Sequence, residues 1–257
     1  MDALHRIARA FNNFHATNLR KNFGTQNIFL YKGHFSPFYF MEIPPYTPNE
    51  EQANFWTHFV PALIALPATL VLLYVHYDAS DAFFLFGIAL FGITAFLTFS
   101  ASSAYHRSTH LPTKKHLRLL DHLAIYALIA GSYSPFVLGN LRHDRGYFIF
   151  ALVWLIAFVG ISFKIAVRNN FERYERIDPF LYVVLASPVF FFLDALHASV
   201  AVKGIWWLTV GGAFYVSGIA FFQWSSLPYH HAIWHLFVIA GASMHFYAVL
   251  HYAHLPA

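Results

Sequence analysis

The sequence predicts an all-α membrane protein, a seven-transmembrane-helix bundle with a cytoplasmic N-terminus and a C-terminus outside. Three observations predict it. Hydrophobic residues make up 58% of the 257 residues and charged residues only 11%, whereas a soluble domain holds about 25% charged residues. The apolar residues gather in runs long enough to cross a bilayer. The Lys and Arg residues are shared unequally between the connecting segments.

Composition also limits the chemistry that the chain can perform. Because it has no cysteine, it can form neither a disulfide nor a thiolate metal ligand, and any metal site must use His, Asp or Glu. A pI near 9.2 would suit nucleic acid, but in a multi-pass protein basic residues more often mark cytoplasmic loops. We therefore expect membrane lipids as partners and no nucleic acid; the composition indicates no particular oligomeric state.

The first 45 residues are predicted to form an N-terminal cytoplasmic tail. Residues 1–40 hold five basic residues but lack the apolar core and small-residue cleavage site of a secretory signal peptide. We expect Met41 as an alternative start of the chain. The prolines that follow it, together with a Thr-Pro pair and several acidic residues, indicate a loop leading into the membrane domain, which covers 46–257.

Seven apolar segments follow, near the 17 to 25 residues or so that a membrane helix needs. They lie at 56–76, 83–105, 121–138, 147–167, 179–196, 205–224 and 231–252. The third and fifth are the shortest, and Ser134-Pro135 and Ser187-Pro188 are expected to kink or end them. Five glycines in these segments are expected to be close helix-packing points: Gly131, Gly160, Gly211, Gly212 and Gly218.

The orientation follows from counting Lys and Arg on alternate sides of these segments. One side holds the tail, the second connection and the fourth connection, with 13 basic residues, and the other side holds 3. The positive-inside rule then places the N-terminus in the cytoplasm and, after seven crossings, the C-terminus outside.

Five polar residues are predicted to meet at the cytoplasmic end of the bundle. His231 and His235 stand four residues apart, so on a helix they share one face. Ser102 and His106 have the same spacing at the end of the second segment, and Asp121 opens the third. Ionisable groups are costly at membrane depth and often mark functional sites, so their shared depth indicates one site.

The residue types favour a metal. Three neutral imidazoles with a fourth position open to water form the ligand set of a catalytic zinc site. In this interpretation His106, His231 and His235 bind the metal. Asp121 either closes a structural site as a fourth ligand or stands beside the metal and holds a water. The alternative is that these are satisfied core histidines, in a chain with 17 histidines.

The remaining histidines are given structural interpretations. His110, His116 and His122 are expected to be solvated or interfacial, and His58 and His76 to be interfacial at the two ends of the first helix. His245 follows His235 by ten residues, about 15 Å along a helix, so it cannot bind the same metal and is expected to be hydrogen-bonded in the core. No HExxH, GxSxG or P-loop pattern competes with the zinc interpretation.

Four ordered motifs resemble a known family. They read EQANFWTH at 51–58, SSAYHRSTH at 102–110, LLDHLAIYALIAGSYSPF at 119–136 and PYHHAIWHLFVIAGASMHF at 228–246. These motifs are similar to those of the hemolysin III family, the bacterial branch of the progestin and adipoQ receptor family. The resemblance covers the chain from about 45 to the C-terminus.

This resemblance implies a multi-pass protein of the bacterial inner membrane, with seven helices and a cytoplasmic N-terminus. It also implies a zinc ion held by three histidines, which fall by motif on His106, His231 and His235, with Asp121 and Ser102 beside the metal. The wider group is similar to alkaline ceramidases, which hydrolyse lipid amides.

Three functions follow as hypotheses. In a zinc-dependent hydrolase of lipid amides or esters, Asp121 would orient a water or accept its proton, and Ser102 would hold the oxyanion or the water. In a receptor or structural protein, Asp121 would coordinate directly and leave no reactive water. A cytolytic pore needs a polar stripe along several helices, whereas this sequence concentrates its polar groups at one end. Glu51 and Asn54 in the first motif are further candidates for a role near the site.

Overall fold

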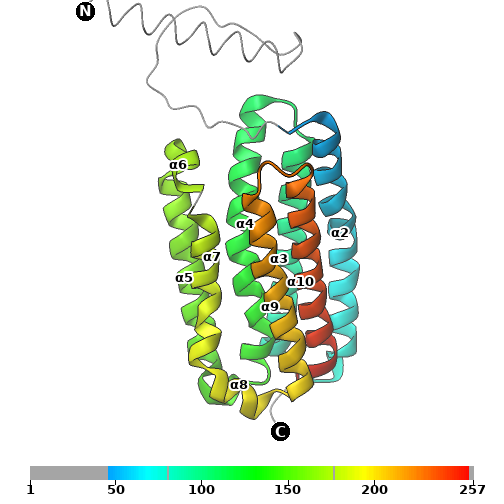
Figure 1. Ribbon diagram of the computed structural model, residues 1–257. Coiled ribbons are helices and arrows are strands. Elements are labelled where there is room, and N and C mark those ends of the chain that lie inside the picture. The colour runs from blue at the N-terminus through cyan, green and yellow to red at the C-terminus, as the bar shows by residue number, and fades with distance from the viewer. Residues whose placement is uncertain (1–45, 80, 176, 255–257) are drawn as a thin grey trace, which may run out of the picture. The chain divides into compact units, whose positions relative to one another are not determined.

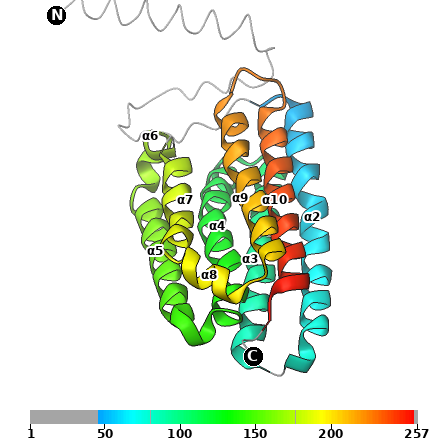
Figure 2. The same cartoon turned by 60° about the horizontal axis from the view of Figure 1, so that its bottom comes forward.

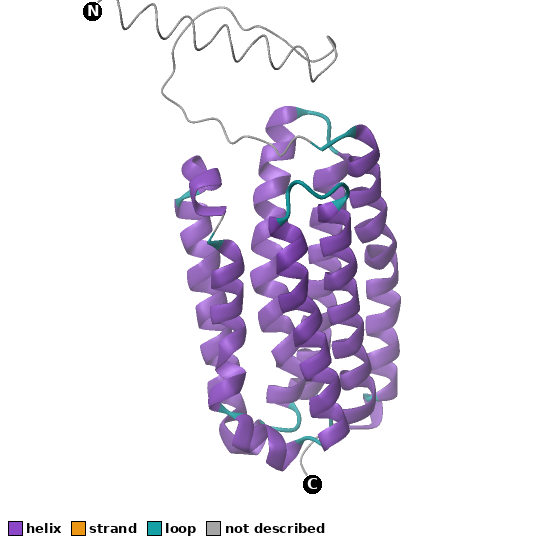
Figure 3. Cartoon of the chain, viewed as in Figure 1, coloured by secondary structure: helices purple, strands orange, loops and turns teal. Residues whose placement is uncertain are grey.

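The structure is a computed structural model that describes residues 46–79, 81–175 and 177–254. The tail predicted over 1–45, with the alternative start at Met41, lies outside them. The described chain consists of helices joined by short turns, with no strand among these residues (Figures 1 and 3). The longer helices are α2 (Pro48–Val75), α3 (Ala82–Arg107), α4 (Leu111–Leu138), α5 (Tyr147–Ala166), α9 (Val202–Gln223) and α10 (His230–Tyr252). The shorter elements are η1 (Tyr77–Ala79), η2 (Arg142–Gly146), η3 (Arg168–Asn170), α6 (Phe171–Glu175), α7 (Asp178–Ala186), η4 (Ser187–Phe191) and α8 (Leu193–Ser199).

Five of these helices are long and apolar enough to cross a membrane: α2, α3, α5 counted from Arg142, α9 and α10. The segment Arg173–Phe191 and α8 pass the same test together across a bend of 62°, and counting them as one span gives six. The chain is therefore a multi-pass helical membrane protein. Helix α4 corresponds to the third predicted crossing and would bring the count to seven. It does not pass the test of length and composition, because polar residues are interspersed among its apolar ones.

The surface of the bundle is that of a lipid-facing protein. Large apolar side chains point outward from several helices, among them Leu63 of α2, Leu155 of α5 and Val216 of α9, each about 60% exposed. Polar side chains lie inside instead, such as Thr98 and Ser134. A soluble protein rarely exposes so much contiguous apolar surface, so this distribution agrees with the helix lengths.

Two helices begin earlier than the apolar runs predict. A capping box starts α2 at Pro48, because the Thr47 side chain accepts from the Glu50 backbone N–H while the Glu50 carboxylate accepts from the Thr47 backbone N–H. Helix α4 starts at Leu111 rather than at 121, since its first turns are basic and escape a search for apolar residues. Asp121 therefore lies well inside α4 instead of opening it.

The two proline sites behave differently. Helix α4 continues for three residues past Pro135 and ends at Leu138, so this proline lies in its last turn. Helix α7 ends immediately before Ser187-Pro188, and the chain goes on as η4 and then bends into α8. The prediction for the second pair is confirmed.

Most of the predicted packing glycines do face a neighbouring helix. A Cβ at Gly131 would lie 2.1 Å from Thr94 Oγ1, one at Gly160 would lie 2.3 Å from the Tyr126 ring, and those at Gly211 and Gly218 would meet α10 side chains at 2.4 and 2.7 Å. Gly212 is the exception, because nothing lies within 4 Å of its Cβ position. The prediction for Gly212 was wrong: this glycine borders open space.

The arrangement of α2, α3 and α10 determines where the site forms. These helices lie side by side, with α2 at one edge of the bundle (Figures 1 and 2). The backbone N–H of Tyr229, in a left-handed conformation before α10, donates to the Glu50 carboxylate at 3.0 Å. The first turns of α2 and α10 are therefore held together at one end of the bundle. At the other end, buried Asn140 bonds the Ser199 and Tyr252 carbonyls and the His254 N–H.

Candidate metal centre

Three histidines from two helices converge between α3 and α10. His106 comes from the last turn of α3, and His231 and His235 come from the first two turns of α10. One nitrogen from each lies within 4.8 Å of the other two, and all three side chains are buried. The i and i+4 positions of His231 and His235 place both rings on one side of α10, as the sequence predicts.

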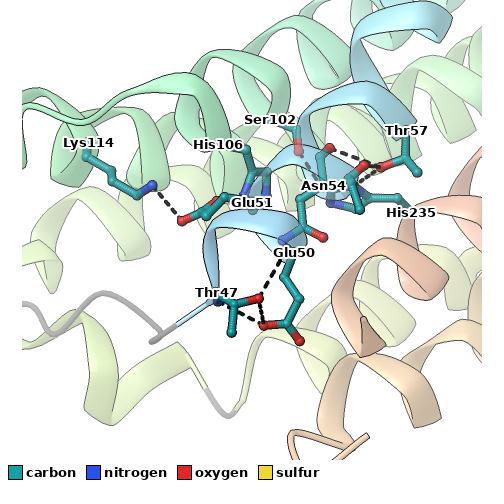
Figure 4. A network of polar contacts seen from close by, with 10 residues as sticks. Thr47, Glu50, Glu51, Asn54, Thr57, Ser102, His106, Lys114 and His235 are labelled. Carbon is teal, nitrogen blue, oxygen red and sulfur yellow. Dashed lines mark hydrogen bonds and ion pairs between the residues drawn. The ribbon is translucent and has the colours of Figure 1, made fainter. Parts of the chain in front are cut away.

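His106 keeps one nitrogen free. Its Nδ1 lies 2.7 Å from Glu51 Oε2, and the other carboxylate oxygen of Glu51 accepts from Lys114 Nζ at 2.7 Å (Figure 4). A carboxylate only accepts hydrogen bonds, so Nδ1 carries the hydrogen. In the neutral ring Nε2 then offers its lone pair, and Nε2 is buried without a hydrogen-bond partner among the described residues.

His235 is oriented in the same way by a hydroxyl. Thr57 Oγ1 donates its proton to the backbone carbonyls of Ala53 and Asn54 and lies 2.8 Å from His235 Nδ1 (Figure 4). Because the single hydroxyl proton is already used, Thr57 accepts from Nδ1–H. The Nε2 lone pair of His235 is again left toward the other rings, with Ser102 Oγ 3.5 Å away.

These nitrogens fit a metal ion better than a satisfied core. Both nitrogens of His231 and Nε2 of His106 are buried with no partner in the described chain. Buried polar groups normally have partners, because desolvating them without one is costly. A partner that fixes Nδ1–H and aims Nε2 inward is also the usual arrangement around metal-binding histidines.

The two other predicted site residues lie beside the triad. Ser102 of α3 is fully buried and approaches His235, one turn before His106. Asp121 of α4 is buried and interacts with Ser102 and His106. Among the described residues, the group of nitrogens and oxygens close enough to share one ion contains the three histidines and not Asp121.

Helix α2 contributes residues that the sequence interpretation undervalued. Glu51 and Asn54, named only as further candidates, lie at the site: Glu51 orients His106, and Asn54 is fully buried near His235. Thr57 was missed. His58 is not interfacial as predicted but buried and stacked on His235, with ring centroids 3.6 Å apart. The signal available was a polar stripe at 51, 54 and 58, which share one face of an apolar helix.

Tyr46, just before α2, lies against the outer side of the triad. Its ring centroid is 5.3 Å from that of His231 and 6.0 Å from that of His106. Burial raises the pKa of the Tyr46 phenol well above its ordinary value, so the group stays protonated. Tyr46 therefore shields this end of the site from water with a neutral ring.

A large cavity leads away from the triad into the bundle. It has a volume of about 590 Å³ and is bordered by α4, α7, α9 and α10, with Asp121, His231 and His235 in its wall. Most of the other lining side chains are apolar. Val183 and Phe190 on one side and Val216 on the other line the cavity and are also exposed. The cavity therefore reaches the lipid-facing surface between α7 and α9.

A second polar group lies near the triad and corrects several predictions. His122 is buried rather than solvated or interfacial, because α4 begins at Leu111 and His122 lies well inside the helix instead of near its start. Arg118, counted from sequence in a connecting segment, is buried within α4, and Lys164 is buried within α5. With Glu175 and Asp178 they form what we call the buried charge cluster: Arg118, His122, Lys164, Glu175 and Asp178. His110 and His116 are exposed, as predicted.

This fold and site define the class of protein: a multi-pass helical membrane protein with a buried histidine triad at one end of its bundle. Comparison with known proteins identifies the family. Residues 46–246 match the family model described as haemolysin-III related. The chain is 36% identical to the hemolysin-3 homolog of Bacillus subtilis over 80% of this chain and 96% of that protein. It is 35% identical to hemolysin-3 of Bacillus cereus over 79% of this chain and 92% of that protein.

More distantly, the chain is 29% identical to the human monocyte to macrophage differentiation factor, over 80% of this chain and 85% of that protein. The chain belongs to the haemolysin III family, the bacterial branch of the progestin and adipoQ receptor family. The resemblance inferred from the four motifs is confirmed.

Proposed function

We propose that this protein is a zinc-dependent hydrolase of membrane lipid amides or esters. The observation that carries the proposal is the set of inward nitrogens on His106, His231 and His235, two of which are fixed in the metal-binding tautomer by Glu51 and Thr57. When bound, zinc lowers the pKa of a coordinated water to about 7 and polarises a carbonyl oxygen.

Asp121 and Ser102 are the proposed catalytic residues. The Asp121 carboxylate lies in the cavity wall, apart from the three nitrogens but beside Ser102. We assign it the role of general base, which orients the attacking water and accepts its proton. The Ser102 hydroxyl donates to the water or to the oxyanion that develops from the carbonyl. Tyr46 excludes bulk water from the opposite side.

The shape and lining of the cavity indicate the class of substrate. Its apolar walls and its reach to the lipid-facing surface between α7 and α9 suit a lipid chain that enters sideways from the bilayer. The polar end, where Asp121 and the triad lie, then receives the amide or ester. The substrate carbonyl is thereby brought to the histidines without leaving the membrane.

We also propose seven crossings, with α4 as the crossing additional to those that length and hydropathy identify. Helix α4 runs alongside α3 in the bundle (Figure 1) and is 28 residues long, enough to span about 30 Å of hydrocarbon. The excess of Lys and Arg supports a cytoplasmic N-terminus, and the bacterial relatives support the bacterial inner membrane as the location. Reporter fusions before α2 and after α10 test this; a cytoplasmic reporter after α10 would rule it out.

The second candidate is a receptor-like or cytolytic protein in which zinc is structural. The names of the two Bacillus relatives favour the cytolytic version. It requires Asp121 to bind the metal directly and complete a four-ligand site. The two candidates therefore assign Asp121 different chemistry, and this residue is where they can be separated.

The decisive experiment substitutes Asp121→Asn and measures zinc content and lipid-amide hydrolysis on the same purified samples. If Asp121 is a general base, Asp121→Asn should still bind zinc, with a loss of metal affinity of at most about 10- to 100-fold. The rate of hydrolysis should fall by about 10²-fold or more. Asp194→Asn, at an exposed carboxyl, is the matched control and should change neither.

Two outcomes would count against the hydrolase. Loss of zinc from Asp121→Asn, with zinc retained in the control, would make Asp121 a ligand and favour a structural site. If zinc-loaded wild type hydrolysed no ceramide, other N-acyl amide or ester, the proposed hydrolase function would be wrong.

The role of the cavity has its own test at Gly212. Because nothing lies within 4 Å of its Cβ position, Gly212→Leu should fit without displacing the helices and should fill part of the cavity. We expect zinc content to be unchanged and hydrolysis of long-chain amides to fall much more than that of short-chain amides. Equal effects on both chain lengths would show that the chain lies elsewhere.

A further inference from the structure

The cavity contains a second polar position, far from the triad. Tyr215 of α9 and His245 of α10 both line it, and their rings meet edge to face with centroids 5.5 Å apart. The Tyr215 hydroxyl and His245 Nδ1 are buried without a hydrogen-bond partner among the described residues. Two such groups side by side in an apolar wall require an explanation, because buried polar atoms are normally satisfied.

The hydrogen-bonding roles of the two groups are complementary. His245 Nε2 lies 3.2 Å from the Leu208 carbonyl oxygen, and since a carbonyl only accepts, Nε2 carries the hydrogen. Nδ1 of the neutral ring is therefore an acceptor, while the Tyr215 hydroxyl is free to donate. One donor and one acceptor together match a hydroxyl group, which both accepts and donates. A carbonyl oxygen would satisfy Tyr215 and leave His245 Nδ1 unpaired.

The backbone is shaped around these two rings. Gly211 of α9 faces His245, where an added Cβ would lie 2.4 Å from the ring, and Gly241 of α10 faces Tyr215, where it would lie 2.8 Å from the ring. Each helix thus omits a side chain opposite the polar ring of the other. Close packing explains the glycines, but it does not explain why the two rings placed there carry polar atoms.

The position of the pair determines what could reach it. His245 follows His235 by ten residues on α10, which is about 15 Å along the helix. The cavity wall between them includes Val238 of α10, and most of the cavity lining is apolar. A volume near 590 Å³ lies within the usual range for ligand sites. A ligand that spans the cavity therefore meets a polar end, an apolar stretch and then a hydroxyl-matching pair.

We propose that this protein binds a lipid whose chain carries a hydroxyl group about 15 Å from the headgroup-bearing end, and that Tyr215 and His245 bind that hydroxyl. The orientation, with the amide or ester at the triad, rests on the proposed function. The binding of the hydroxyl by the pair does not depend on hydrolysis. An ordered water would also satisfy both groups, and the experiment distinguishes it from a lipid hydroxyl.

The test compares two amides that differ in one hydroxyl, N-oleoyl and N-ricinoleoyl ethanolamide, the latter hydroxylated on the twelfth carbon. Their affinities for the purified full chain in nanodiscs are measured by competition with a fluorescent lipid. We expect wild type to bind the ricinoleoyl amide about tenfold more tightly, the size of effect expected from satisfying two buried partners. Tyr215→Phe should remove this preference and leave oleoyl binding unchanged.

The matched control is Tyr126→Phe. The Tyr126 hydroxyl is also buried without a partner among the described residues, but it is not in the cavity wall. The Tyr126→Phe variant should therefore keep the full preference for the ricinoleoyl amide. A third amide, hydroxylated beside the carbonyl, should gain nothing from Tyr215.

Three results would overturn the inference: equal binding of both chains by wild type, as expected if water fills the pair; a preference that survives Tyr215→Phe; or a Tyr215-dependent gain for the hydroxyl beside the carbonyl. The two proposals fail separately. Preferential binding without hydrolysis would remove the hydrolase and keep this site, whereas hydrolysis without chain preference would do the opposite.

Discussion

The histidine triad and the buried charge cluster both contain buried histidines at the same end of the bundle, but the hydrogen bonds of these histidines differ. In the cluster, His122 Nδ1 lies 2.8 Å from Asp178 Oδ2, and its Nε2 faces Glu175 at 3.5 Å. Lys164 forms an ion pair with Asp178, and Arg118 forms an ion pair with Glu175. In the triad, by contrast, His106 has a partner within the described chain for only one ring nitrogen and His231 has a partner for neither. His235 has a second partner only in Ser102, whose hydroxyl oxygen lies 3.5 Å from Nε2.

This difference separates a structural polar group from a ligand site. Both nitrogens of His122 face carboxylates, so both have partners. The triad has one inward lone pair on each of two rings and two unpartnered nitrogens on His231. Burial is similar in both groups, so the number of free nitrogens, and not the presence of buried histidine, supports the proposed metal site.

The largest effect expected from this comparison is on zinc content. His231→Ala should abolish zinc binding in purified protein, because it removes one of three ligands. His122→Ala, an equally buried histidine in the next cluster, should retain about one zinc per chain. Metal analysis of both variants in the folded, monodisperse fraction checks this. Zinc retention by His231→Ala would mean that the triad is not the metal site.

The cluster should instead determine stability. Asp178→Asn leaves Lys164 buried with a neutral partner, and breaking a buried ion pair in this way costs roughly 3–5 kcal/mol. Denaturant unfolding in detergent would measure it, with zinc per folded chain unchanged. The double variant Lys164→Met with Asp178→Leu removes both charges and should recover much of the loss. No recovery would mean that the cluster matters through its shape and not its charge pairing.

The sequence predicted the triad and missed the cluster for one physical reason. His231 and His235 lie within an apolar run and His106 directly follows one, where a polar side chain is conspicuous and helical spacing shows which ones share a face. Arg118 lies before the third run, and His122 and Lys164 lie close to the ends of theirs, so from sequence they looked like loop or interfacial residues. Pairing across α4, α5 and α7 depends on tertiary packing, which spacing along one helix does not reveal.

Helix α2 lies between these extremes. Its apolar run was recognised, but the polar turns before it were interpreted as a loop, although Thr47 and Glu50 form a capping box that starts the helix. Glu51 and Asn54 were candidates through their motif alone. Thr57 could not be identified from sequence, since a threonine in a membrane helix most often bonds its own backbone, as Thr69 does.

That contrast within α2 gives a finer test of how the triad is oriented. Thr57→Val removes the acceptor of His235 Nδ1–H while keeping the shape of the side chain, and we expect about a tenfold loss of zinc affinity. Thr69→Val removes a hydroxyl that bonds Ala65 and no histidine, so zinc affinity should not change. Competition with a chromophoric chelator measures both. Equal affinities in the two variants would show that Thr57 does not orient the ligand.

The smallest effect is expected at a partly exposed ion pair outside both the triad and the buried charge cluster. Asp81 caps α3 by accepting from the Phe84 N–H and pairs with Arg142. The bond from Arg142 holds the pKa of the Asp81 carboxyl below its ordinary value of 3.8. Asp81→Asn keeps a good cap residue and removes only the charge, so the loss of stability should be a small fraction of that expected for Asp178→Asn.

The pH dependence of this small effect has a definite sign. A carboxyl with a lowered folded-state pKa stabilises the protein fully above its unfolded pKa, and the stabilisation is lost as the pH falls through the folded value. Wild type should therefore exceed Asp81→Asn at neutral pH, and the two should converge as the pH falls below about 3.8. The measurement is the free energy of unfolding of wild type and Asp81→Asn in detergent, at neutral pH and below about pH 3.8. Asp144→Asn, at a half-exposed carboxyl, is the control. A gap that widens on acidification would show that Asp81 acts through something other than its pairing with Arg142.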